Sequence, residues 1–98
     1  MMRYLIKVTY TDGAHAGKSY LLSKGGYVTD ESDVHWEETT YKTLGLCRHI
    51  CKLAYEDNEQ SVAQERADNE WRLAHGKEPY RYHIYDHCSF EPYAVEIG

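Results

Sequence analysis

The chain has 98 residues, of which 42% are hydrophobic and 28% are charged. This length suffices for a single domain, residues 1–98, and excludes two independent hydrophobic cores. Sixteen acidic side chains against eleven Lys and Arg give a formal net charge of −5, which makes direct nucleic-acid binding unlikely, because phosphate contacts need a cationic surface.

Three features of the sequence bear on localisation. No apolar run approaches the roughly 18 residues that a membrane span needs, and the first residues lack the length and the cleavage site of a signal peptide. The three cysteines, Cys47, Cys51 and Cys88, are an odd number, which favours free thiols over a secreted disulfide scaffold. We therefore expect a soluble, cytoplasmic protein.

The sequence of the N-terminal third predicts three strands. Residues 3–11 alternate in polarity, as a half-buried strand does, with Leu5 as the exception. The expected apolar face consists of Tyr4, Ile6, Val8 and Tyr10. A loop with two glycines leads to a second strand over residues 19–23, and Gly25-Gly26 turns the chain into a short third strand over residues 27–29.

Two helices follow in the prediction. Thr39 and Thr40 are suitable caps for a helix over about residues 41–57, whose wide apolar arc indicates deep burial. Its expected core residues, Leu44, Ile50 and Cys51, should face Ile6 and Val8. A second, more polar helix spans residues 60–75 and ends at Gly76. One helix across both segments would be about 54 Å long, so we expect a break near residues 57–59.

Two more strands complete the prediction. Residues 80–85 alternate again, and residues 93–97 form a short strand after Pro92, at an edge of the sheet. The order βββ-αα-ββ predicts an α+β domain: an antiparallel sheet of four to five strands with two helices on one face.

The sequence favours a protein without catalysis. Gly17-Lys18-Ser19 resembles the end of a phosphate-binding loop, but it leads into a strand rather than a helix. Cys47 and Cys51 could share a metal with His87 and Cys88, yet their place in an apolar arc favours buried thiols. The six histidines accompany no nucleophile motif. We expect no enzyme activity, no catalytic residue, no cofactor and no metal.

The expected binding residues are carboxylates and tryptophans. An acidic stretch surrounds one tryptophan, and a second tryptophan lies on a thin stripe of the second predicted helix; these expected partner-binding residues are Asp30, Glu31, Asp33, Trp36, Glu37, Glu38 and Trp71. Rim carboxylates would speed encounter with a basic surface, and a buried aromatic side chain would hold the complex together. The alternatives are a solvated loop and a helix covered by another element.

A second functional hypothesis uses the sheet. The aromatic side chains of residues 80–85 alternate with Arg81 and His83, and together with Arg3 and Lys7 they could form a face that stacks bases. The alternative function is therefore a small domain that binds single-stranded RNA or DNA.

Three short motifs carry a family resemblance, over roughly residues 3–55. They are Gly25-Gly26-Tyr27-Val28-Thr29, Trp36-Glu37, and Thr40-Tyr41-Lys42-Thr43 before a helix rich in Ala and Cys. This pattern resembles small orphan accessory proteins of bacteriophages and mobile elements of Gram-positive bacteria, some of which are anti-CRISPR inhibitors. The resemblance implies a non-enzymatic viral inhibitor in the host cytoplasm. Its partner would be a host protein complex that handles nucleic acid and has a basic surface.

Overall fold

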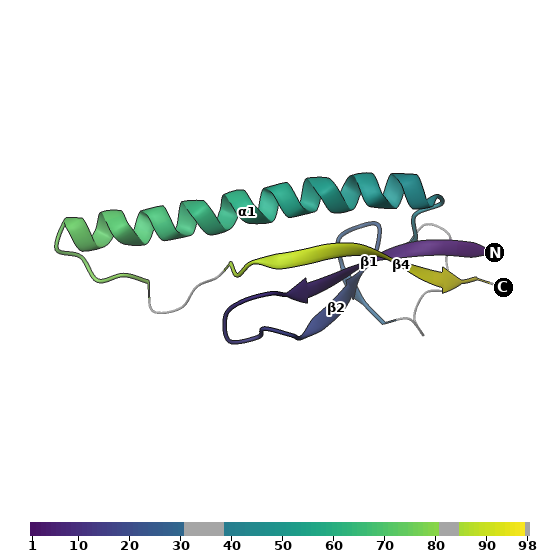
Figure 1. Ribbon diagram of the computed structural model, residues 1–98, viewed down its shortest axis with the longest axis horizontal. Coiled ribbons are helices and arrows are strands. Elements are labelled where there is room, and N and C mark those ends of the chain that lie inside the picture. Colours follow the sequence, from purple (N-terminus) through teal and green to yellow (C-terminus); the bar gives the residue numbers. More distant parts are fainter. Residues whose placement is uncertain (31–38, 81–84, 98) are drawn as a thin grey trace.

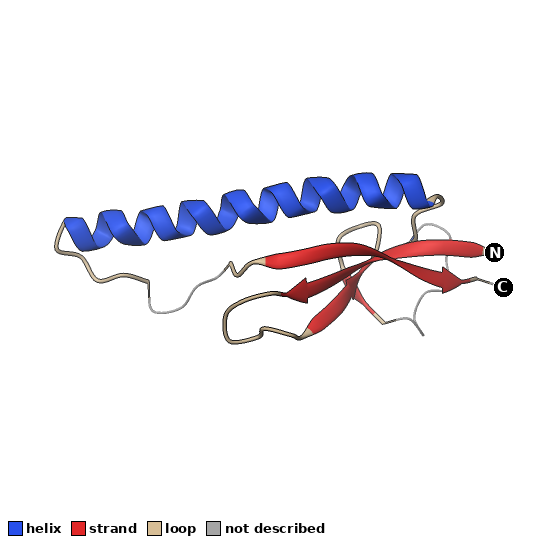
Figure 2. Ribbon diagram, in the orientation of Figure 1, coloured by secondary structure: helices blue, strands red, loops and turns tan. Residues whose placement is uncertain are grey.

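The fold is that of a computed structural model, in which residues 1–30, 39–80 and 85–97 are described (Figure 1). The strands β1 (Met2–Tyr10), β2 (Ser19–Leu22), β3 (Val28–Thr29) and β4 (Cys88–Glu96) form an antiparallel sheet in the order β3-β2-β1-β4. One long helix, α1 (Leu44–Ala74), lies along the sheet (Figure 2). The α+β class and the antiparallel sheet are confirmed, whereas the expected pair of helices is wrong.

The first strand follows the predicted alternation. Ile6 and Val8 are buried in the core cluster that includes Cys47 and Cys51 of α1, so this face of β1 packs on the helix. Leu5, which breaks the alternation, has no exposed surface although it points to the other face. Both faces of β1 are therefore covered at this point, which explains why an apolar side chain occupies an otherwise polar position.

The last strand is longer than the sequence indicates. All of β4 pairs with β1, from Tyr10 opposite Cys88 to Met2 opposite Glu96, and Pro92 lies within the strand rather than before it. Proline is tolerated in an outer strand where its missing N–H would point away from the neighbouring strand. The predicted edge position is confirmed for the described sheet, since β4 pairs only with β1.

The strand predicted for residues 80–85 is not present where the chain can be described. Tyr80 and Tyr85 have no strand conformation, and residues 81–84 lie outside the described residues.

The expected break in the helix is also wrong, because α1 continues for 31 residues. Its length of about 46 Å at 1.5 Å per residue fits a molecule whose long axis measures 58 Å. The polar residues at the supposed break connect the helix to β4: the Asn58 side chain donates to the Asp86 carbonyl oxygen and accepts from the Cys88 amide, each at 3.0 Å. Polarity at this point marks an attachment rather than a helix end.

The helix begins and ends with well-defined caps. Thr43, not Thr39 or Thr40, is the N-cap, and its hydroxyl accepts from the Leu46 amide at 3.1 Å. Tyr41 instead bridges Tyr4 of β1 through two backbone hydrogen bonds. At the C-terminal end, Gly76 has a φ of +69°, which glycine adopts without strain, and the chain turns away from α1 there.

The core lies under the N-terminal half of α1. Ile6, Val8 and Cys51 are buried as predicted, but Leu44 and Ile50 are only half-buried. Leu53 is nearly half exposed, so the apolar arc is wider than the buried face. The C-terminal half of the helix extends past the sheet (Figure 1), and its fully buried apolar side chain is Val62.

Candidate partner-binding groove

Of the seven predicted partner-binding residues, the structure describes Asp30 and Trp71. Asp30 is exposed just after β3, and Trp71 is 52% exposed near the C-terminus of α1. The remaining five, Glu31, Asp33, Trp36, Glu37 and Glu38, lie outside the described residues.

Trp71 belongs to the end of the helix. Its ring stacks on His75 with 4.2 Å between ring centroids, and Lys77 Nζ lies 4.8 Å from the ring centroid. Trp71 therefore covers the turn that ends α1, and about half of its surface is left for a partner.

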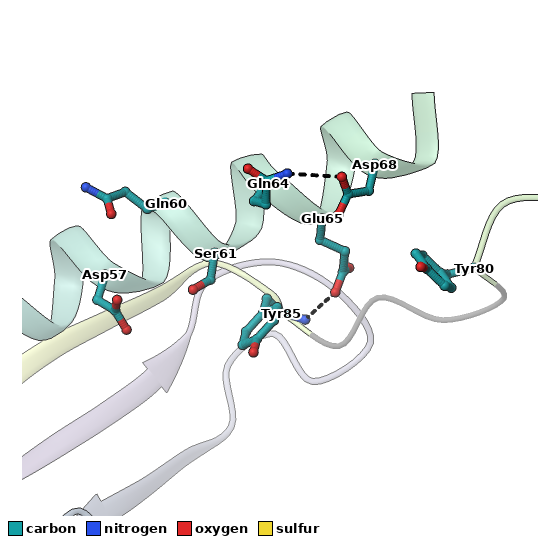
Figure 3. Close-up of a pocket in the computed structure, with 8 residues that line it drawn as sticks. All are labelled: Asp57, Gln60, Ser61, Gln64, Glu65, Asp68, Tyr80 and Tyr85. Atoms are coloured by element: carbon teal, nitrogen blue, oxygen red, sulfur yellow. Dashed lines mark hydrogen bonds between the residues drawn. The ribbon is translucent and has the colours of Figure 1, made fainter. Parts of the chain in front are cut away.

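An open groove lies beside the C-terminal half of α1 (Figure 3). It has a volume of about 520 Å³ and is bounded by the helix and by the chain that returns toward β4. The residues that line it are Asp57, Gln60, Ser61, Gln64, Glu65, Asp68, Tyr80 and Tyr85. Carboxylates and tyrosine rings thus converge in one hollow, which the sequence analysis did not predict.

The helical spacing explains why these carboxylates share the groove. Asp57, Glu65 and Asp68 recur at intervals of eight and three residues, which brings them to one flank of an α-helix. The spacing alone is a weak signal, because a solvated helix face has the same pattern.

The described side chains that line the groove include three carboxylates and no Lys or Arg. Glu65 is 92% buried, and its carboxylate accepts from the Tyr85 amide at 3.1 Å. Asp68 accepts from the Gln64 side chain at 3.0 Å, while Asp57 has no hydrogen bond or ion pair to any described residue. Of the two arginines of this half of the helix, Arg66 contacts Asp12, whereas Arg72 donates to the Glu78 carbonyl oxygen and lies over the ring of Tyr80.

The outer wall of the groove is fixed to the helix. The Tyr80 amide donates to Asn69 Oδ1 at 2.9 Å, and the Arg72 guanidinium lies 4.6 Å from the Tyr80 ring centroid. Arg72 Nε also donates to the Glu78 carbonyl oxygen at 2.8 Å. These contacts hold the Tyr80 side of the groove in place before any ligand arrives.

A second polar cluster joins three elements around His87. His87 Nδ1 lies 2.8 Å from Glu59 Oε1, and Nε2 lies 3.2 Å from Arg66 Nη1. Because a guanidinium only donates, Nε2 accepts and the Nδ1–H donates to Glu59. Desolvation acts to raise the pKa of Asp12, but the hydrogen bond from the His87 amide and the Arg66 guanidinium outweigh it, so this pKa lies below its ordinary value.

This cluster has the geometry of a structural joint. Its contacts connect α1 to the residue before β4 and to the β1–β2 loop. The nearby Thr11 hydroxyl donates to the His87 carbonyl oxygen at 3.0 Å rather than to the ring. Within the described residues, no hydroxyl or thiol is bonded to the imidazole, so the arrangement lacks the nucleophile that a histidine base would activate.

Comparisons with protein families, curated proteins and solved structures found no match. The function therefore has to follow from the chemistry of the molecule's own surfaces, since a fold alone does not imply a function.

The three thiols lie in the core rather than at a surface site. Cys47, Cys51 and Cys88 are free and buried, and the Cys47 Sγ donates to the Leu5 carbonyl oxygen at 3.4 Å. Across residues 1–30, 39–80 and 85–97, no three His, Cys, Asp or Glu side chains are grouped to hold a metal ion. That the protein binds no metal stays a prediction.

Burial predicts that these thiols are inert. Desolvation raises the pKa of Cys47 from 9.0 to about 12, and the thiolate is the reactive form. At pH 8, we expect iodoacetamide to modify native Cys47 about a thousandfold more slowly than Cys47 of the urea-unfolded chain. Mass spectrometry of timed samples measures this difference. Modification of the native and unfolded chains at equal rates would show that Cys47 is not buried.

The sheet face of the nucleic-acid hypothesis is partly occupied. Arg3 is buried, and its Nε donates to Thr40 Oγ1 at 2.9 Å, so its guanidinium is not available to a phosphate. Lys7 is half-buried, and Arg81 and His83 lie outside the described residues.

Within the described part of the chain, no helix is long and apolar enough to cross a membrane.

Proposed function

We propose that this chain is a non-enzymatic binding protein that recognises a basic segment of a partner protein through the acidic groove of Figure 3. The observation that carries the proposal is the convergence of Asp57, Glu65 and Asp68 with Tyr80 and Tyr85 around one hollow of about 520 Å³.

An arginine side chain matches this lining best. Its planar guanidinium can pair with a carboxylate through two hydrogen bonds and stack on an aromatic ring. Asp57 and Asp68 lie at the solvent side of the groove and can receive such a cation. The Tyr85 ring and the face of Tyr80 that Arg72 does not cover supply surfaces against which it can pack.

The net charge of −5 supports the same partner chemistry over longer distances. A negative molecule attracts a basic surface and speeds the encounter, most strongly at low salt. Asp30 and the acidic residues that follow it in the sequence would add to this attraction. Their role in attracting a basic partner remains a proposal.

A partner that handles nucleic acid would present the required basic surface. By occupying that surface, this chain would compete with nucleic acid and inhibit the partner. We prefer this hypothesis to nucleic-acid binding by the sheet, because Arg3 is buried and its positive charge is not available to a phosphate on the sheet face.

The test uses a fluorescein-labelled octapeptide that alternates arginine and glycine, measured by fluorescence anisotropy. We expect Asp57→Asn combined with Asp68→Asn to weaken binding by about tenfold or more, because both removed charges face the groove. Both positions are exposed, so the melting temperature should change little.

The matched control is Glu70→Gln, which removes a carboxylate from an exposed position on the same helix that does not line the groove. Its effect should stay within about twofold. Equal losses in the control and in the double variant would mean that only net charge matters. Either that result or a failure of the peptide to bind would overturn the proposed groove.

A further inference from the structure

The outer edge of β4 offers backbone groups that pair with no described strand. Tyr4 makes both of its backbone hydrogen bonds to Tyr41, on the side of β1 away from β4. Because hydrogen-bonded and non-hydrogen-bonded pairs alternate in an antiparallel ladder, the Tyr4–Ala94 pair is non-hydrogen-bonded. The backbone groups of Ala94, and of Phe90 and Pro92 at the same phase, therefore point outward from the described sheet.

These outward groups form a short binding edge. Phe90 and Ala94 each present an N–H and a carbonyl oxygen, whereas Pro92 presents only a carbonyl oxygen. An open strand edge can accept a strand from another chain, and a proline weakens such pairing without preventing it.

A groove runs between this edge and α1. It has a volume of about 360 Å³ and is lined by Arg48, Cys51, Lys52 and Tyr55 of the helix and by Ser89, Phe90 and Pro92 of β4. A strand added to β4 would lie about 4.8 Å from it. Every second side chain of that strand would then enter the groove under the flank of the helix.

The helix side of this groove is basic. Arg48 and Lys52 lie one turn apart and are both exposed. Neither makes an ion pair with a described residue, and like charges at this spacing repel each other. An acidic side chain placed between them would relieve that repulsion, and the rings of Tyr55 and Phe90 would pack against its stem.

We propose that the edge of β4 binds an extended acidic segment of a partner protein as a fifth strand, with its carboxylates facing Arg48 and Lys52. Main-chain hydrogen bonds to Phe90 and Ala94 would hold the segment, and the basic groove would select its side chains. This site lies beside the N-terminal half of α1 and is independent of the acidic groove.

The probe is a fluorescein-labelled octapeptide that alternates glutamate and valine, with a lysine–valine octapeptide as the charge control. We expect only the acidic peptide to raise the anisotropy. Arg48→Glu combined with Lys52→Glu should weaken its binding by more than about tenfold. N-methylation of the acidic peptide along one edge should abolish binding, while N-methylation along the other edge should not.

Two substitutions at the edge test the backbone pairing itself. Ala94→Pro removes an outward N–H that β1 does not use, so the fold should persist while binding weakens by about fivefold. Pro92→Ala adds an outward N–H and should tighten binding by about threefold. Thermal melting of each variant confirms that it is folded.

Three results would overturn this proposal. The first is failure of the acidic peptide to bind. The second is loss of binding on charge reversal with no effect of the edge substitutions or of N-methylation, which would place the peptide in the groove without strand pairing. The third is a dimeric mass in light scattering that Ala94→Pro reduces to the monomer, which would show that the edge pairs with a second copy.

Discussion

Val8→Asp is expected to abolish cooperative folding. Val8 has no exposed surface and lies in the core cluster between β1 and α1. An unpaired charge at such a position costs several kcal/mol, which is comparable to the whole stability of a small domain, about 5–10 kcal/mol. Circular dichroism at room temperature should show an unfolded chain with no thermal transition.

The control for this prediction is Leu53→Asp, which places the same charge at an exposed position of α1, the helix against which Val8 of β1 packs. Leu53 is 47% exposed, so this variant should keep a cooperative melt close to that of the wild type. A folded Val8→Asp variant would mean that β1 does not pack on α1 as described.

The contrast between these two positions shows what the sequence can predict. In β1 the period of two identifies Ile6 and Val8 directly, because a strand that packs on a helix alternates between core and the other face. In α1 the apolar residues of the sequence overestimate the width of the buried face. Leu46 and Leu53 share the apolar arc but are exposed, because only one side of the helix meets a sheet.

The error at residues 57–59 has a different physical origin. The expected break rests only on the assumption that the domain is compact. The sequence around residues 57–59 contains no Gly or Pro, the residues that end a helix most readily. The structure is elongated, with extents of 58 × 22 × 20 Å, so the long helix is accommodated. Asn58 and Glu59 are polar because they bind the residues at the start of β4.

The acidic groove could not be found from local patterns. It exists because the chain after Gly76 folds back on α1, so that Tyr80 meets Asn69 and Tyr85 meets Glu65. Each of these contacts joins residues 11 to 20 positions apart, and no periodicity in a single segment encodes them. Trp71, which the sequence did single out, covers the turn that begins this return.

Val62 is the buried apolar side chain of the C-terminal half of α1. Val62 is 1% exposed and lies outside the main core cluster. The helix beyond it extends past the sheet (Figure 1) and is held mainly by the polar contacts of Glu65, Asn69 and Arg72. An isolated helical segment of this length is marginal in water, so its order depends on those few contacts.

Val62→Asp is therefore expected to unfold the C-terminal half of α1 while β1 and its neighbours stay folded. Hydrogen exchange should show loss of protection over residues 62–74, and the arginine–glycine octapeptide should bind more than about tenfold more weakly, because the groove loses its walls. The neighbouring Ala63→Asp puts the same charge on an exposed position and should cost only about 0.7 kcal/mol, with protection and binding retained. Loss of protection throughout the sheet in Val62→Asp would instead show that the two halves of the molecule unfold as one unit.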